Sequence, residues 1–320
     1  MEGLGQLIKS IRREKGMTVA EISEGICTER FTYMVENKDQ SPSVTILKEF
    51  SERLGVNLFE YFDYIGCSRP IQSKDLGDRS KVLRYKREYD RIREITDEME
   101  NSEDAETYPL KYEILSNQIN LELYLMKNRE KAKELIINGI RELTGNTVKE
   151  ILLRGDWKED YHFVNLFNYL FLYYKTQGEE EKASSILSFL NNGIQNLSKV
   201  GDFQVLTVSI MINYLHDEIF IHRSTECLEE LEQLLESQIK ENNLNRVFLT
   251  YYLFFGHYYN RGELIKAREY FKKFVAAGES TGIEMQYREL LNALDENMFL
   301  SVCPEGAITF DVKMKRKLWI

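Results

Sequence analysis

The fold of this chain is decided by residues 18–36, which read TVAEISEGICTERFTYMVE. Thr18 is a natural N-cap for a short helix over 19–25, and Glu21, three residues later, completes a capping box. Thr28 can cap a second helix that continues to residue 36. Two short helices joined this tightly are typical of a helix-turn-helix.

Helical periods on both sides of this pair extend it into an all-α module. Apolar residues recur at helical spacing over 4–11, and Gly16 ends that helix. The run at 41–43, Ser-Pro-Ser, marks the entry of another helix, with an apolar stripe over 46–54. A fifth short helix is expected over 58–62. Five short helices in about 60 residues predict a compact DNA-binding domain over 1–66.

The run from Ile22 to Glu36, with the later motifs Ser41-Pro42-Ser43, Ile46-Leu47 and Leu54-Gly55-Val56, resembles the Cro/C1-type (XRE) helix-turn-helix family. The resemblance implies that the helix after Thr28 enters the DNA groove. The chain departs from the family pattern at two positions. Val19 stands where a glutamine is common, and Lys38 stands where a glycine is usual, so that Asn37 is expected to adopt the left-handed conformation.

The position of each residue in this motif predicts how the domain would contact DNA. The outward face of the recognition helix comprises Thr28, Glu29, Arg30 and Tyr33. Arg30 is the candidate for a guanine, because its planar fork matches O6 and N7, whereas Glu29 could accept from a cytosine or be a solvated helix-start acid. Phosphate contacts are expected from Arg12, Arg13, Thr18, Ser41 and Ser43, although a solvated face is the alternative for the two arginines.

The rest of the chain has the pattern of helical hairpin repeats. Residues 67–80 (CSRPIQSKDLGDRS) lack an apolar period and are predicted to be a linker, followed by a repeat domain over 81–302 and a tail over 303–320. Similar helix joins recur with a small residue at Ala132, Ala183, Cys227 and Ala267, separated by 51, 44 and 40 residues. This pattern predicts a right-handed, tetratricopeptide-like α-superhelix with a concave binding face.

Two regions of this repeat domain are candidates for ligand binding. In the helix over 160–176, Asn165 and Asn168 are expected opposite the apolar stripe, beside Tyr161 and Tyr169. Asparagine offers donors and an acceptor suited to the backbone of an extended peptide, although a solvated face is the alternative. Asn213 and Tyr252 are further peptide-binding candidates, and the helix over 245–260 is apolar nearly all round, which fits a central helix, an aromatic pocket or a dimer interface.

The whole chain resembles the RRNPP peptide-pheromone regulators, and within them the Rgg/GadR/MutR-like branch. The resemblance rests on the N-terminal motif, the size of the repeat domain and the run Gly155-Asp156-Trp157 to Leu166-Phe167-Asn168. It implies a cytoplasmic homodimeric transcription regulator that binds an operator in double-stranded DNA and a short peptide, as in quorum sensing. The alternative is a helix-turn-helix regulator whose repeats dock a protein partner.

Other features of the sequence narrow the function further. The formal net charge of −10 argues against a protein coated in nucleic acid but allows a local basic patch. We expect no membrane contact, because no long apolar run and no signal peptide are present. Four dispersed cysteines lack metal-ligand spacing, and no P-loop or dinucleotide motif occurs. We therefore expect no cofactor, no metal and no enzymatic activity.

Overall fold

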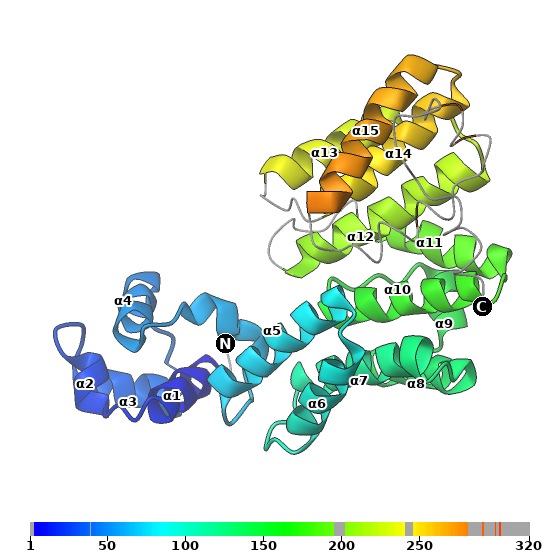
Figure 1. Cartoon of the computed structure of the whole chain (residues 1–320). Helices are drawn as coiled ribbons and strands as arrows, with labels where there is room; N and C mark the ends of the chain where they lie inside the picture. The colour runs from blue at the N-terminus through cyan, green and yellow to red at the C-terminus, as the bar shows by residue number, and fades with distance from the viewer. Residues whose placement is uncertain are drawn as a thin grey trace. The chain divides into compact units, whose positions relative to one another are not determined.

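The computed structural model describes residues 3–38, 40–194, 202–240 and 246–280, together with residues 290, 298 and 301. The described residues contain helices and no strand, which confirms the predicted all-α class. The chain divides into two compact units, Met1–Gly178 and Glu179–Ile320 (Figure 1), and each is described by itself. No helix in these ranges is long and apolar enough to cross a membrane.

The N-terminal part of the first unit is a five-helix head. It comprises α1 (Leu4–Glu14), α2 (Val19–Ser23), α3 (Glu29–Lys38), α4 (Val44–Leu54) and the 3₁₀ helix η1 (Leu58–Tyr64). Thr18 begins α2 with a capping box, as predicted. The run 41–43 marks the entry of α4, as predicted, but Ser43 is the N-cap and Pro42 precedes the helix instead of lying in its first turn. Its core forms where apolar side chains of different helices meet, among them the fully buried Ile8, Ile22 and Phe50.

The prediction of a linker without regular structure over 67–80 is wrong, because most of these residues belong to a long helix, α5 (Pro70–Lys86). Its buried positions recur at helical spacing but are occupied largely by small residues, such as Ser73, Gly77 and Ser80. The sequence of α5 therefore shows no apolar period, although the helix is well packed. A Cβ atom at Gly77 would lie 2.8 Å from the Tyr64 hydroxyl, so glycine permits η1 to approach α5 closely.

The remaining elements form helical hairpins. In the first unit these elements are α6 (Tyr89–Glu100), α7 (Leu110–Asn120), the π-helical turn η2 (Leu121–Leu125), α8 (Arg129–Thr144), α9 (Val148–Arg154) and α10 (Tyr161–Thr176). In the second unit they are α11 (Glu180–Ile194), α12 (Asp202–His216), η3 (Asp217–Ile221), α13 (Leu228–Lys240), α14 (Val247–Asn260) and α15 (Leu264–Ser280). Within the first unit, α10 packs against α8 and α7.

The four small residues identified from the sequence are all buried where the second helix of a hairpin begins. The hairpins close through two kinds of turn. A π-helical turn precedes a left-handed Lys127 or Arg223, whereas Gly262 supplies the left-handed residue between α14 and α15. The longest repeat interval, 51 residues, contains the extra helix α9. The predicted tail over 303–320 lies outside the described residues.

Candidate functional sites

The first candidate site is the exposed face of the recognition helix α3. Glu29, Arg30 and Tyr33 are exposed on this helix, and Tyr33 keeps 54% of its surface. Thr28 is also exposed, and its hydroxyl accepts a hydrogen bond from the Phe31 amide at 3.2 Å, which caps the helix. The opposite face of α3 is buried through Val35. The four residues predicted to read DNA therefore lie together on the outside of the head.

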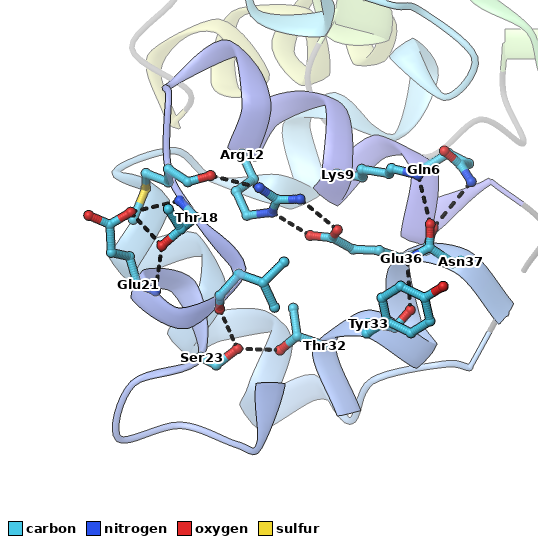
Figure 2. A network of polar contacts seen from close by, with 12 residues as sticks. Gln6, Lys9, Arg12, Thr18, Glu21, Ser23, Thr32, Tyr33, Glu36 and Asn37 are labelled. Atoms are coloured by element: carbon cyan, nitrogen blue, oxygen red, sulfur yellow. Dashed lines mark hydrogen bonds and ion pairs between the residues drawn. The ribbon is translucent and has the colours of Figure 1, made fainter. Parts of the chain in front are cut away.

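Arg12 does not lie where a phosphate contact requires it, and this prediction is corrected. Its side chain is buried, and its Nε and Nη2 atoms donate to the two carboxylate oxygens of Glu36 at 2.6 and 2.8 Å (Figure 2). Nη1 donates to the Met17 carbonyl at 2.6 Å. The hydrogen bonds to Glu36 raise the pKa of the guanidinium above its ordinary value. Arg12 thus joins α1 to α3, and its buried side chain bonds to groups inside the head.

Other polar contacts hold α3 at both ends (Figure 2). At its start, the hydroxyls of Ser23 and Thr32 lie 2.8 Å apart and connect α2 to α3. Near its end, Lys9 donates to Asn37 Oδ1 at 2.7 Å, and Asn37 Nδ2 donates to the Tyr33 carbonyl. Asn37 is helical, so the predicted left-handed conformation at this position is wrong.

The residues predicted to hold phosphates differ in what their side chains do. Arg13 is exposed at the end of α1, and Ser41 is exposed before α4. Thr18 and Ser43 are exposed but already use their hydroxyls as helix caps, accepting from the amides of Glu21 and Ile46. The Thr18 hydroxyl also donates its proton to the Glu21 carboxylate at 2.8 Å, so a phosphate would have to displace this bond. The Ser43 hydroxyl accepts through its oxygen when it caps α4, which leaves its proton available for a phosphate. These four positions remain predictions.

The second candidate site is a buried polar cluster between α5, α7 and α10, called here the polar cluster. Its side chains are those of Ser80, Lys81, Arg84, Glu113, Ser116, Asn117, Asn120, Tyr161, His162, Asn165, Asn168 and Tyr169. Arg84 is central, because it forms an ion pair with Glu113 and donates to Asn117 Oδ1 at 2.6 Å and to the Ser80 hydroxyl at 2.7 Å.

Charge and burial set the protonation states of this cluster. Burial alone would raise the pKa of Glu113, but the charges of Arg84 and Lys81 outweigh it and hold the pKa at about 2. Burial lowers the pKa of His162 below its ordinary value, so this imidazole is neutral at neutral pH. The cluster therefore holds the charges of Arg84, Lys81 and Glu113, surrounded by neutral amide, hydroxyl and imidazole groups.

The structure brings the four predicted residues of α10 to this cluster, but not on a solvated face. Residues 162–171 of α10 are all buried. Asn165 Nδ2 donates to the Ser116 hydroxyl at 3.2 Å, and the Tyr169 hydroxyl accepts from Asn120 at 2.5 Å. Asn168 Oδ1 is buried without a hydrogen-bond partner among the described residues, as is His162 Nδ1. The predicted Asn–Tyr face is thus covered, because α10 packs on α7 as well as on α8.

The other two predicted peptide-binding residues belong to the second unit. Tyr252 is 4% exposed in the aromatic core, with its ring stacked on Phe220 at 4.6 Å. Tyr252 therefore cannot contact a peptide without repacking this core, which corrects the prediction for that residue. Asn213 is half-buried on α12 and remains a prediction.

The sequence analysis missed the arginine and carboxylate at the centre of the polar cluster. A signal was present, because Glu113, Asn117 and Asn120 have the i, i+4, i+7 spacing of one helix face. Ser80 and Arg84 are likewise four residues apart. Because the predicted linker ends at residue 80, it places Ser80 in the linker and Arg84 in the repeat domain. The two residues were therefore not assigned to one helix face.

We predict that breaking the Arg12–Glu36 pair unfolds the head. Glu36→Leu leaves a buried, unpaired guanidinium and should destabilise the head by about 3–5 kcal/mol. The double variant Arg12→Met with Glu36→Leu should recover most of this loss, because no isolated charge remains. Hydrogen exchange of the α1 and α3 amides measures both. Equal protection in Glu36→Leu and the unchanged chain would contradict the account.

A second prediction concerns pH and Glu113. Because its folded pKa is lowered to about 2, this carboxylate stabilises the fold above its unfolded pKa of about 4.3, and the contribution is lost as pH falls toward 2. Urea unfolding should show the full deficit of Glu113→Gln, about 3–5 kcal/mol, near neutral pH. The difference from the unchanged chain should shrink between pH about 4 and pH about 2. A deficit that is constant over this range would show that the ion pair is not its source.

Comparison with known proteins identifies the fold. No family model and no curated protein matches the chain. Bacillus thuringiensis PlcR, solved with the peptide PapR7 and DNA, is 18% identical over 91% of this chain and 100% of its own, with a TM-score of 0.61. ComR from S. thermophilus, solved with DNA and its signalling peptide ComS, is 17% identical over 89% and 97%, with a TM-score of 0.53. The Streptococcus dysgalactiae SHP pheromone receptor Rgg2 is 10% identical over 90% and 97%, with a TM-score of 0.43. The predicted resemblance to the RRNPP regulators is thereby confirmed for the fold: this chain has the helical fold of PlcR and ComR.

Proposed function

We propose that this chain is a transcription regulator that binds double-stranded DNA through α3 and is controlled by a short peptide bound in its repeat domain. One observation carries the proposal: α3 presents Arg30 and Tyr33 to solvent while its inner face is locked to α1 by a buried ion pair. A rigid helix with an exposed face of hydrogen-bonding side chains fits the major groove. PlcR and ComR, which share this fold, were each solved with a peptide and DNA.

In this proposal, the exposed face of α3 reads bases and the surrounding residues bind phosphates. Arg30 binds a guanine through O6 and N7, and Glu29 accepts from a cytosine. Thr28 and Tyr33 complete the reading face. Phosphates are held by Arg13, Thr18, Ser41 and Ser43, which flank the helix in the sequence. Residues 1–66 are then the DNA-binding domain and residues 81–302 the sensing and dimerisation domain.

The regulator is proposed to act as a homodimer in the cytoplasm. One helix-turn-helix buries a modest area on DNA, so useful affinity requires two half-sites related by a two-fold axis. A regulator must also be in the compartment that holds its operator, which places it in the cytoplasm. No enzymatic activity is assigned, in keeping with the regulators PlcR and ComR.

The peptide is proposed to bind at the polar cluster. A buried oxygen without a hydrogen bond costs about 1–3 kcal/mol, and Asn168 Oδ1 is such an atom. His162 Nδ1 is a second one nearby in the sequence. A peptide backbone carries amide donors at regular intervals, so a bound peptide can supply hydrogen bonds that this part of the protein lacks. Asn168 is only 8% exposed, so in this proposal the helices that cover α10 move apart to admit the peptide. Asn168 then binds the ligand directly, whereas Asn165 and Tyr169 support the cluster.

We predict different roles in DNA binding for Arg30 and Arg13 of the head. Arg30→Ala should cost about 1–3 kcal/mol and relax the preference at one base pair, because it removes a base contact. Arg13→Ala should weaken binding to all sequences and lower the salt slope of log K by about 1, because it removes a phosphate contact. The assay is fluorescence polarisation on a duplex that the unchanged chain selects from random DNA. Failure to select any duplex would refute the DNA-binding function.

We also predict that two neighbouring asparagines of α10 respond differently. Asn168→Leu should abolish binding of a peptide selected by the unchanged chain from a random library of short linear peptides. Its stability should not fall, because the substitution removes an unsatisfied buried oxygen. Asn165→Leu is the matched control and should lower stability by about 1–3 kcal/mol, since it leaves its partners unsatisfied. Calorimetry and urea unfolding measure both, and undiminished binding by Asn168→Leu would contradict the proposed site.

A further inference from the structure

Helix α5 begins without a cap of its own. Its N-cap residue, Arg69, makes no capping hydrogen bond with its side chain. Pro70 at the first helical position has no N–H, but the amides of Ile71 and Gln72 point out of the helix and need acceptors. The partial positive charge of a helix N-terminus also favours a negative partner there. A polar residue directly before the helix usually meets both needs.

Two carboxylates distant in the sequence take the place of this cap. Glu14, the last residue of α1, accepts from the Ile71 amide at 3.0 Å and from the Gln72 amide at 2.9 Å. Asp104, in the loop before α7, accepts from the Ser68 and Arg69 amides at 2.6 and 2.9 Å. Burial alone would raise the pKa of Asp104, but these hydrogen bonds outweigh it and lower the pKa, which keeps the carboxylate charged.

The two carboxylates come from different parts of the first unit. Glu14 ends α1 of the head, whereas Asp104 lies in the loop between α6 and α7, which follow α5 in the chain. The body of α5 is shared in the same way. Ile71 packs against the core of the head, and Leu76 and Leu83 belong to the core formed with α6 and α7. Farther along, α5 supplies Arg84 to the polar cluster.

We propose that Glu14 is a positioning residue: its double hydrogen bond to the start of α5 fixes the orientation of the DNA-binding head on the first repeats, which belong to the same unit. The residues at the start of α5 donate hydrogen bonds to one carboxylate from each side, so this charged contact joins the head to the first repeats in addition to the packing of Ile71 and of Tyr64 against Gly77. The inference rests on the proposed function, because the orientation of a head matters for binding two half-sites. Loss of the Glu14 carboxylate removes this restraint on the orientation of the head. It does not expose the core of the head, because the Glu14 side chain is on the surface.

Hydrogen exchange tests the contact itself. In Glu14→Ala, the amides of Ile71 and Gln72 should exchange about tenfold faster, the factor that corresponds to loss of a typical helix cap. Ser68 and Arg69, which Asp104 holds, should be unaffected. Glu14→Gln keeps an acceptor without the charge and should give a smaller increase. Glu49→Ala, which removes an exposed glutamate of α4, is the matched control and should leave all four amides unchanged.

The spacing of DNA half-sites tests the positioning role. The duplex is selected by the unchanged chain, and a base pair is then inserted between its half-sites. In Glu14→Ala, the affinity penalty of the insertion should fall by up to about tenfold, because relaxation cannot exceed the strength of the contact. Affinity for a single half-site should stay the same, which a merely unfolded head would not allow.

The outcomes distinguish failure of the positioning role of Glu14 from failure of the proposed DNA-binding function. An unchanged spacing penalty in Glu14→Ala, or unchanged exchange at Ile71 and Gln72, overturns the positioning role. If the unchanged chain selects no duplex, the proposed function fails, and hydrogen exchange alone then decides whether Glu14 fixes the head. Faster exchange together with a reduced spacing penalty supports the proposal.

Discussion

A buried arginine requires a carboxylate partner, and this constraint determines the packing of helices at two places in the first unit of the chain. In the head, Arg12 and Glu36 form a bidentate ion pair that joins α1 to the recognition helix α3. Between α5 and α7, Arg84 and Glu113 do the same for the polar cluster. Breaking either pair leaves an isolated charge in a medium that solvates it poorly, which is far more costly than losing a surface pair. The exposed face of α3 and the arrangement of the polar cluster both depend on these two pairs.

The local features of the head could be predicted because they depend on neighbouring residues. The caps Thr18, Thr28 and Ser43 each act on an amide three residues ahead, a distance that the sequence displays directly. The fate of Arg12 could not be predicted in this way. Its helical position lies at the border between the buried and the exposed face, and only Glu36, 24 residues away, decides that it is buried.

Three other differences between sequence and structure have the same origin. Helix α5 was concealed because its buried face uses serine and glycine, which allow close packing but carry no apolar period. Polar residues of α10 were expected to face solvent or a ligand, whereas Asn165 and Tyr169 bond to partners on α7. Tyr252 occupies a helix that is apolar nearly all round, where packing against residues of other helices, such as Phe220 and Phe274, determines which side is interior. Tertiary partners, not local pattern, decide each of these cases.

The two proposed binding events are linked by one element. Helix α5 donates hydrogen bonds from its first turn to Glu14 of the head, and near its end it carries Arg84, in the cluster where the peptide is proposed to bind. The most direct test is a titration of the full chain on its selected two-site duplex, with and without the selected peptide. The account predicts that peptide changes DNA affinity by about 5–150-fold, the range of an allosteric coupling of 1–3 kcal/mol. Identical affinity at saturating peptide would contradict it.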